Sequence, residues 1–151
     1  MKLDMECLRD VLICVEANTG LHKTCVFYDV PAMEKACSLL EKEMPEIPEY
    51  QKELLKKYDS DTLFYHVLMC VEGNLIKRTT DNASYEAVIS GMTFEGHDFF
   101  ESIRNHSVWE EIKEIMSEKG CEMGFEMVKE LAKLLGAAFV TALVSSHSPI
   151  P

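Results

Sequence analysis

The sequence predicts a mostly helical α+β fold that contains a small antiparallel sheet. Three observations lead to this prediction: apolar residues recur at helical spacing in 59–72, residues 75–79 and 85–90 have the composition of two strands, and the turn-rich run 80–84 separates them. A third strand is expected at residues 24–30, which are rich in β-branched and aromatic side chains. With a helix on either side of the hairpin, these elements outline a winged helix.

The elements before the hairpin begin with a helix that Asp4 caps and that residues 18–20 end. Pro31 ends the strand that follows. Residues 32–43 are expected to form a short helix, which is an addition to a minimal winged helix. Residues 49–58 then form the helix that precedes the central one.

The central helix, residues 59–72, is expected to have Ser60 or Asp61 as its cap and Gly73 as a left-handed stop. One stripe of apolar side chains is expected to face the core: Leu63, Phe64, Val67, Leu68 and Val71. Helical periodicity then turns the remaining face toward solvent. This candidate interaction face consists of Thr62, Tyr65, His66, Met69 and Glu72.

Three further helices are expected after the hairpin. Thr93 is placed to cap the first, and Gly96 is expected to let that helix approach a strand closely. The second begins near Ser107 and ends at Gly120. The last, roughly residues 125–145, becomes apolar on most faces, so we expect it to mediate self-association, with burial inside the monomer as the alternative. The side chains expected to make this contact are Leu131, Leu134, Leu135, Phe139 and Leu143.

The expected domain organisation follows from these elements. Residues 1–104 form the winged-helix-like domain, which includes the extra segment 32–48. Residues 105–146 form a C-terminal helical extension, and residues 147–151 form a polar tail. With 151 residues and 47% hydrophobic content, the chain is large enough to bury a core.

Charge distinguishes two classes of partner. The 26 acidic residues outnumber the 15 basic ones, and the net charge of -11 repels phosphate backbones and favours partners with basic surfaces. Acidic residues also outnumber basic ones in 49–72, where a DNA-reading helix would lie. The residues of the hairpin that could contact a phosphate backbone, the candidate wing, are Lys77, Arg78 and Asn82. A solvated hairpin tip is the alternative interpretation.

The sequence predicts a cytoplasmic protein. Its six cysteines form no CxxC pair and no regular framework, which is typical of reduced, intracellular proteins. The N-terminal segment carries charges and lacks the continuous apolar core of a signal peptide. The longest apolar run, residues 134–144, is shorter than the roughly 20 residues of a membrane-spanning helix. We therefore expect no membrane partner.

Two clusters of polar residues suggest chemistry, and each has an ordinary alternative. His97 lies near Glu95 and Asp98, but residues two apart on a helix point about 200° away from each other, so a packing histidine is the better interpretation. Three residues of zinc-ligand type lie at His22, Cys25 and Cys37. No second pair completes a tetrahedron, and buried thiols are common in cores. We expect no catalytic residue, no metal and no cofactor.

Several segments resemble a known family in their pattern. They are Met1-Lys2-Leu3-Asp4-Met5, Tyr65-His66-Val67-Leu68, Glu72-Gly73-Asn74-Leu75-Ile76, Gly91 to Phe100, Ile103-Arg104 through Trp109, and Val128 to Ala132. On these motifs the chain resembles the uncharacterised family called domain of unknown function 2513, and the segment around Gly96 and His97 is the most specific. The resemblance implies a winged-helix-like fold and an origin on prophages or plasmids, and it implies no established activity. The stretch 32–48 departs from the family pattern, as does the very apolar end of the last helix.

Two functional hypotheses remain open at this point. The first is a non-enzymatic accessory protein of a phage or plasmid that binds a protein through its acidic surface and the candidate interaction face. An inhibitor of a host defence or nucleic-acid-handling protein would have these properties. The second is a winged-helix transcriptional regulator, a dimer that presents two recognition helices to duplex DNA. Charge favours the first hypothesis, fold favours the second, and a homo-oligomer through the last helix is compatible with both.

Overall fold

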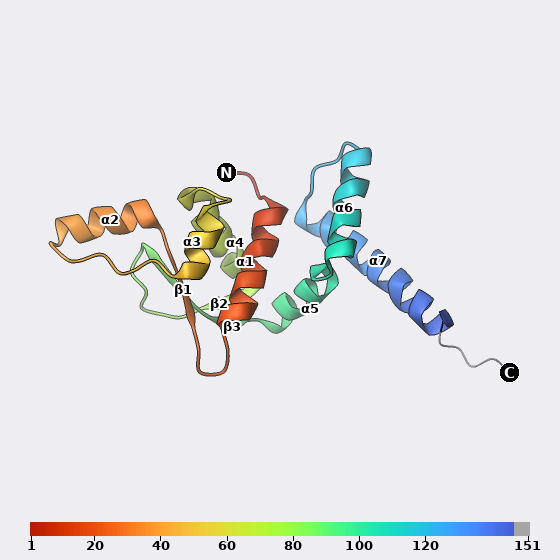
Figure 1. The fold of residues 1–151 in the computed structure, drawn as a ribbon, viewed down its shortest axis with the longest axis horizontal. Helices are drawn as coiled ribbons and strands as arrows, with labels where there is room; N and C mark the ends of the chain where they lie inside the picture. The colour runs from red at the N-terminus through yellow and green to blue at the C-terminus, as the bar shows by residue number, and fades with distance from the viewer. Residues whose placement is uncertain (147–151) are drawn as a thin grey trace. The chain divides into compact units, whose positions relative to one another are not determined.

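The computed structural model describes residues 1–146 of the 151-residue chain. In that range it contains seven helices and one three-stranded antiparallel sheet, which confirms the expected mostly helical α+β class (Figure 1). The chain divides into two compact units, Met1–His97 and a second that begins at Asp98. The tail expected at 147–151 lies outside the described residues, and the domain boundary expected after residue 104 stays a prediction.

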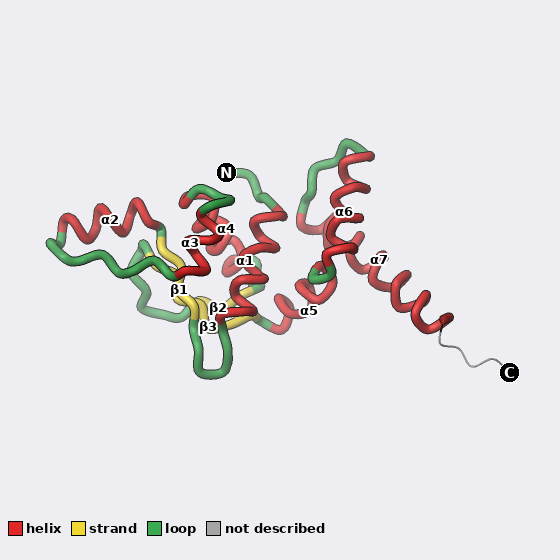
Figure 2. The backbone as a smooth tube through the Cα atoms, in the orientation of Figure 1, coloured by secondary structure: helices red, strands yellow, loops and turns green. Residues whose placement is uncertain are grey.

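The first unit contains most of the elements. They are α1 (Met5–Asn18), β1 (Cys25–Tyr28), α2 (Val30–Leu39), α3 (Glu49–Leu55), α4 (Ser60–Glu72), β2 (Ile76–Arg78), β3 (Glu86–Met92) and the start of α5 (Phe94–Ile103). The sheet has the order β1-β3-β2, so the hairpin strand β3 lies in the middle and the earlier strand completes one edge (Figure 2). The expected hairpin and the expected third strand are therefore confirmed.

Successive side chains point to opposite faces of the sheet, and those on one face are buried. Cys25 pairs with Ile89 and Phe27 pairs with Ala87 in antiparallel register, and all four side chains are buried. Helix α1 packs against both α4 and β3. The core of the first unit therefore lies between the helices and this face of the sheet.

Helices α1 and α4 each begin with an aspartate as their N-terminal cap. The Asp4 carboxylate accepts hydrogen bonds from the amides of Glu6 and Cys7 at 2.9 and 3.2 Å, which confirms the expected cap of α1. For α4 the expectation of Ser60 or Asp61 was wrong, because Asp59 accepts from the Thr62 amide at 2.7 Å. This hydrogen bond holds the pKa of Asp59 below its usual value.

Ser60, the first residue of α4, makes a contact outside its own helix. Its hydroxyl oxygen accepts a hydrogen bond from the Val30 amide at 3.2 Å, at the point where α2 begins. The side chain therefore ties two segments of the first unit together. It is not the cap of its own helix.

Helix α4 ends in a Schellman motif, and its left-handed residue was expected one position too early, at Gly73. Gly73 has φ -75° and Asn74 has φ 57°, so the left-handed residue is the asparagine. The amide of Leu75 donates to the Cys70 carbonyl at 2.8 Å and the amide of Asn74 donates to the Val71 carbonyl at 3.0 Å. The helix runs through Glu72, so Gly73 occupies the cap and the left-handed conformation falls on the residue after it.

The start of α5 is fixed by Thr93 and Gly96, as expected. The Thr93 hydroxyl accepts from the Gly96 amide at 2.8 Å and donates to the Asn74 carbonyl at 2.5 Å. A Cβ atom on Gly96 would lie 1.9 Å from the carbonyl oxygen of Leu75. Only glycine fits where α5 meets the residue that precedes β2, which confirms the expected close approach.

Helix α3 covers the outer edge of β1 with two side chains. The Tyr50 hydroxyl accepts from the Val26 amide at 2.7 Å and donates to the Val26 carbonyl at 2.8 Å. The Gln51 amide group accepts from the Tyr28 amide at 3.0 Å and donates to the Tyr28 carbonyl at 2.7 Å. These side chains replace the hydrogen bonds that a neighbouring strand would make.

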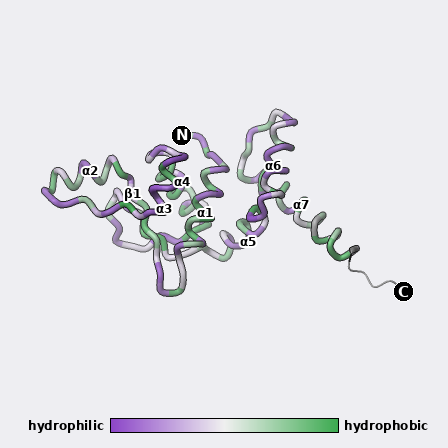
Figure 3. The backbone as a smooth tube through the Cα atoms, viewed as in Figure 1, coloured by the Kyte–Doolittle hydropathy of each residue, from purple (hydrophilic) through white to green (hydrophobic). Residues whose placement is uncertain are grey.

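The second unit is built from the rest of α5 and two helices, α6 (His106–Glu118) and α7 (Phe125–Ser146). Asn105 caps α6, and Gly120, at φ 62°, follows its last turn. The core of this unit is apolar: Phe99, Phe100, Ile103, Trp109, Ile112, Met116, Val128 and Ala132 are buried. Figure 3 shows α7 becoming hydrophobic toward its later turns. None of the helices in the described range has the length and apolar character needed to cross a membrane.

Candidate interaction surface

The structure brings together part of the candidate interaction face on α4. Glu72 is exposed, and Thr62, Tyr65 and Met69 are partly buried. His66 is 0% exposed, so the expectation that it faces solvent was wrong. Without His66, the candidate interaction face consists of three partly buried side chains and one exposed carboxylate, Glu72.

His66 belongs to the buried stripe of α4 for a geometric reason. It lies three residues after Leu63 and four before Cys70, which are both buried, so helical spacing places all three on one side. Its Nε2 accepts from the Asp4 amide at 2.7 Å, and its Nδ1 donates to the Thr62 carbonyl, also at 2.7 Å. The ring is therefore a neutral connector between α4 and the start of α1.

Tyr65 lies against the N-terminal residues. Its hydroxyl donates to the Met1 carbonyl at 3.3 Å, and its ring meets the His66 ring edge-on with centroids 5.3 Å apart. Part of the face predicted to meet a partner is thus used to hold the chain's own first residues. The hydrogen bonds of His66 to Asp4 and of Tyr65 to Met1 have no local signal in the sequence, because the bonded residues are 62 and 64 positions apart.

The candidate wing has one accessible cation. The Arg78 guanidinium donates from Nε to the Asn82 Oδ1 at 3.2 Å and from its terminal nitrogen to the Glu86 carbonyl. The Asn82 Oδ1 also accepts from the Val88 amide at 2.8 Å. Arg78 and Asn82 therefore shape the hairpin loop, while Lys77 is exposed.

The lysines of the α3 region all lie beside carboxylates. Lys56 Nζ is 2.6 Å from Glu53, and Lys57 Nζ is 2.7 Å from Asp10. Lys52 lies 4.0 Å from Glu46 and 3.8 Å from Glu49. In the described residues of α3, α4, β2 and β3 the cations thus form no continuous positive ridge.

Asp10 connects α1 to the end of the α3 region. Its Oδ2 accepts from both Lys57 Nζ and the Tyr58 hydroxyl, each at 2.7 Å. Burial and the hydrogen bond to Asp10 raise the pKa of Tyr58 above its usual value. The Asp10 carboxylate is therefore shared between Lys57 and Tyr58.

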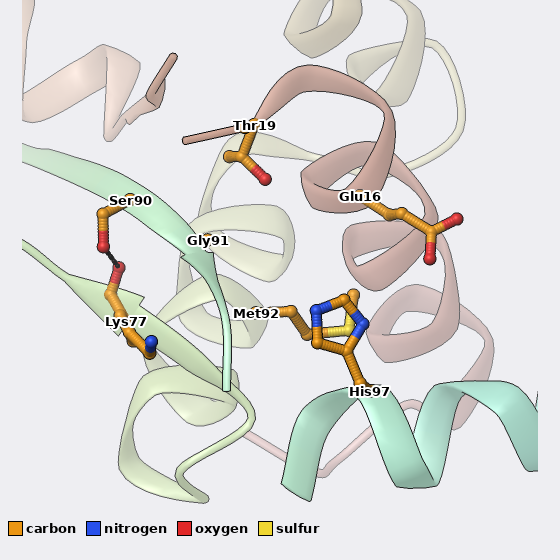
Figure 4. Close-up of a pocket in the computed structure, with 8 residues that line it drawn as sticks. Glu16, Thr19, Lys77, Ser90, Gly91, Met92 and His97 are labelled. Atoms are coloured by element: carbon orange, nitrogen blue, oxygen red, sulfur yellow. Dashed lines mark hydrogen bonds between the residues drawn. The ribbon is translucent and has the colours of Figure 1, made fainter. Parts of the chain in front are cut away.

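A small pocket of about 300 Å³ lies where α1 ends beside the hairpin and α5 (Figure 4). Glu16 and Thr19 line it from the α1 side, Lys77 and Ser90 from the strands, and His97 from α5. The Ser90 hydroxyl donates to the Lys77 carbonyl at 3.4 Å. The lining therefore combines groups of opposite charge around a shallow space.

The residues weighed for catalysis are not assembled into a catalytic group. His97 is exposed at the pocket, near Met92 (Figure 4). The Glu95 carboxylate accepts a hydrogen bond from the Asn74 side-chain amide at 2.8 Å. His97 and Glu95 therefore make separate contacts.

The three residues considered as zinc ligands differ in their exposure to solvent. His22 is exposed, whereas Cys25 and Cys37 are buried. Burial raises the pKa of Cys25 to about 12, which favours the thiol over the metal-binding thiolate. Within residues 1–146, no group of three or more histidine, cysteine or acidic side chains is arranged to hold a metal.

The later turns of α7 expose the apolar side chains expected to mediate self-association. Leu134 is 67% exposed and Leu143 is 46% exposed, while Leu131 and Leu135 are half-buried. The side chain of Phe139 lies outside the described part of the structure. Packing onto α6 thus covers only the early turns, where Val128 and Ala132 are buried.

Comparison with known proteins identifies relatives without a known activity. Residues 2–122 match the model of a family described as hypothetical protein (DUF2513). An uncharacterized protein of Haemophilus influenzae is 25% identical over 80 residues, which cover 52% of this chain and 68% of that protein. No solved structure matches the chain.

Proposed function

The chain belongs to the family of hypothetical proteins DUF2513, and from that premise we propose that it acts without catalysis, by binding a protein whose surface is basic. One observation carries this proposal. The lysines of the α3 region lie beside carboxylates and Arg78 is used inside the hairpin loop, so the exception among the cations of these described elements is Lys77.

The scaffold itself is best interpreted as a winged helix. Its order is helix, strand, two helices, strand and strand, interrupted by α2, and the sheet order is β1-β3-β2. In such folds the helix before the hairpin is the one offered to a DNA groove. That helix, α4, has Asp59 as its cap, Asp61 in its first turn and Glu72 as its last residue, so both of its ends carry acidic residues.

The charge count separates the two candidate functions. Tight duplex binding usually neutralises several phosphates, on the order of six for strongly salt-dependent binders. Lys77 alone is insufficient for that, and a net charge of -11 opposes encounter with DNA. The same charge accelerates encounter with a partner that presents lysines and arginines.

The partner class follows from these charges. Proteins that handle nucleic acid carry basic grooves, and an acidic protein that occupies such a groove would inhibit them. We propose further that the protein originates from a phage or plasmid, that it acts on a host defence or nucleic-acid-handling protein, and that it is cytoplasmic. Self-association through α7 is part of the same proposal, supported by the exposure of Leu134 and Leu143.

A second candidate function is DNA binding as a transcriptional regulator. The observation that favours it is the element order, which is that of a DNA-reading scaffold. In this alternative, α7 would hold a dimer that spans two half-sites. It requires Lys77 and a rearranged Arg78 to contact phosphates.

Fluorescence anisotropy with a labelled duplex distinguishes the two functions. At low ionic strength we expect no saturable complex between the full chain and duplex DNA, and no difference between the wild type and Lys77→Ala. A tight complex that weakens steeply with salt and is lost in Lys77→Ala would overturn the proposal and support the regulator. A basic DNA-binding domain of similar size serves as the positive control.

A further inference from the structure

Helix α2 and the loop that follows it form an arm, residues 30–48, that projects from the rest of the first unit (Figure 1). Its base is fixed by hydrogen bonds. The Asp29 amide donates to the Tyr85 carbonyl at 2.8 Å, and the Val30 amide donates to the Ser60 hydroxyl at 3.2 Å. The Asp29 carboxylate also accepts from the Ala32 amide and caps the helix.

The arm is packed along one side and apolar at its tip. Met33 and Cys37, four residues apart on α2, are 0% and 6% exposed and hold the helix in place. The tip is defined by Leu39, Leu40 and Met44, which are 76%, 60% and 43% exposed. Single exposed apolar residues are common on protein surfaces, but three within six positions at the end of a projection make the tip a candidate docking surface.

The turn at the tip uses an unfavourable residue. Glu41 has φ 52°, a left-handed conformation that favours glycine, and it follows the end of α2. The Lys42 amide donates to the Cys37 carbonyl at 2.9 Å and the Glu41 amide donates to the Ser38 carbonyl at 3.3 Å, which completes a Schellman motif. Glycine would make this turn more easily, and glutamate places a carboxylate next to the exposed leucines.

The charges around the tip are mostly negative. Within residues 30–48 four acidic residues face two basic ones: Glu34, Glu41, Glu43 and Glu46 against Lys35 and Lys42. Within the tip itself, residues 39–44, the acidic residues are Glu41 and Glu43, with Lys42 between them, so two carboxylates flank the apolar side chains there. This arrangement is complementary to an apolar cleft that has lysines and arginines at its rim, because interfaces bury apolar anchors at their centre and keep charged groups at their periphery.

We propose that Leu39, Leu40 and Met44 insert into an apolar cleft of the partner protein, and that Glu41 and Glu43 pair with cations at the rim of that cleft. The inference rests on the proposed function and names the contact that it uses. An anionic membrane surface is disfavoured by the acidic residues of the tip, and a tip-to-tip contact between two copies of this chain is disfavoured because Glu41 and Glu43 of both copies would face each other.

Site-specific photo-crosslinking tests this contact in cells of the source organism. A photoreactive amino acid is placed at Leu40, at Tyr65 on α4, or at Leu21, which is 93% exposed and lies outside the arm. We expect a discrete adduct with one protein from Leu40 and none from Leu21, with the protein identified by mass spectrometry. An adduct between two copies of this chain, or equal labelling from Leu21, would overturn the arm contact.

The protein identified in this way is then purified and titrated with variants of the full chain. The double variant Leu39→Ser and Leu40→Ser should bind it at least about tenfold more weakly, while Leu21→Ser binds like the wild type. Glu41→Gln with Glu43→Gln should weaken binding and reduce its dependence on salt. All substituted side chains are exposed, and thermal melting checks that each variant is folded.

The outcomes separate the two proposals. An adduct from Tyr65 without one from Leu40 removes the arm contact and leaves the proposed function intact. The absence of an adduct from both positions counts against both proposals. Equal affinity of the double serine variant and the wild type for the identified protein also overturns the arm contact.

Discussion

At the scale of single residues, Gly96 and His66 determine how the first unit is assembled. Gly96 lets α5 begin directly on the backbone of Leu75, because a Cβ atom there would lie 1.9 Å from the Leu75 oxygen. His66 joins α4 to the amide of Asp4 from a fully buried position. Both residues belong to contacts between segments, so their substitution affects the whole unit.

Substitution of Gly96 by alanine should destabilise the protein by about 3 kcal/mol, since the new methyl group meets backbone that must move. Urea unfolding followed by circular dichroism measures the change. Gly136→Ala is the control, because a Cβ atom at that position in α7 meets nothing within 4 Å and alanine favours helix. Equal midpoints for Gly96→Ala and the wild type would contradict the close approach.

Substitution of His66 by leucine should lower the free energy of unfolding by about 2 kcal/mol, because the Asp4 amide loses its buried acceptor. The same denaturation experiment applies. His97→Leu is the matched control, since His97 is exposed and its loss should change stability by less than about 0.5 kcal/mol. If the two variants were equally stable, the connecting role of His66 would be wrong.

At the scale of elements, individual residues complete the hydrogen bonds of backbone groups where helices and strands end. Tyr50 and Gln51 provide the hydrogen bonds that β1 lacks on its outer side. Asn74 provides the left-handed residue that ends α4. Each device satisfies backbone groups that would otherwise be buried without a partner.

Substitution of Gln51 by leucine should cost about 3 kcal/mol of stability, because the amide and the carbonyl of Tyr28 both lose their partner. Hydrogen exchange adds a local measurement, since the Tyr28 amide should exchange faster in this variant. The neighbouring Lys52→Gln substitution, at an exposed position, should leave both quantities unchanged. Unchanged exchange at Tyr28 would show that this side chain is not its partner.

The sequence was sufficient to predict the helices and strands, but it was insufficient to predict the contacts between distant segments. Asp4 and Thr93 were predicted correctly because a cap is a local property, and Gly96 because a glycine within a helix indicates close contact with another segment even where that segment is distant in the sequence. The burial of His66 and the edge cover by Gln51 were missed because their partners are 62 and 23 residues away. A polar residue inside an otherwise buried i, i+3, i+4 stripe was the available signal for His66.

At the scale of the whole molecule, the surface separates into acidic and apolar parts. The charged side chains of α3 pair with their neighbours, while apolar side chains are exposed at the tip of the arm and along the later turns of α7. Most of the cysteines, in contrast, are not on the surface. Five are buried, and Cys121 is exposed.

The thiols should therefore react in two classes. Burial raises the pKa of Cys7 and Cys25 to about 12 and that of Cys14 to about 11, so these groups stay protonated at pH 8 and are shielded from reagent. An aromatic disulfide reagent should titrate one thiol quickly in the native protein and all six after addition of denaturant. Cys121→Ser should abolish the fast phase, and a remaining fast phase would contradict the burial of the others.

Self-association through α7 should be sensitive to charge at its exposed apolar positions. Leu134→Glu is expected to convert a dimer to a monomer in sedimentation velocity, because it places a charge in the proposed contact. The adjacent Lys133→Glu, at an exposed position, tests whether any added negative charge has the same effect. A monomeric wild-type protein at all concentrations would refute the oligomer.

The cover on β1 limits how this protein can recognise other chains. A peptide that lengthens a sheet must bond to open amides and carbonyls at its border, and Tyr50 and Gln51 already occupy those of Val26 and Tyr28. Fibril growth from this side is blocked for the same reason. Strand addition at the β1 edge would therefore first require α3 to detach, and a partner that meets this side of the sheet is expected to contact side chains.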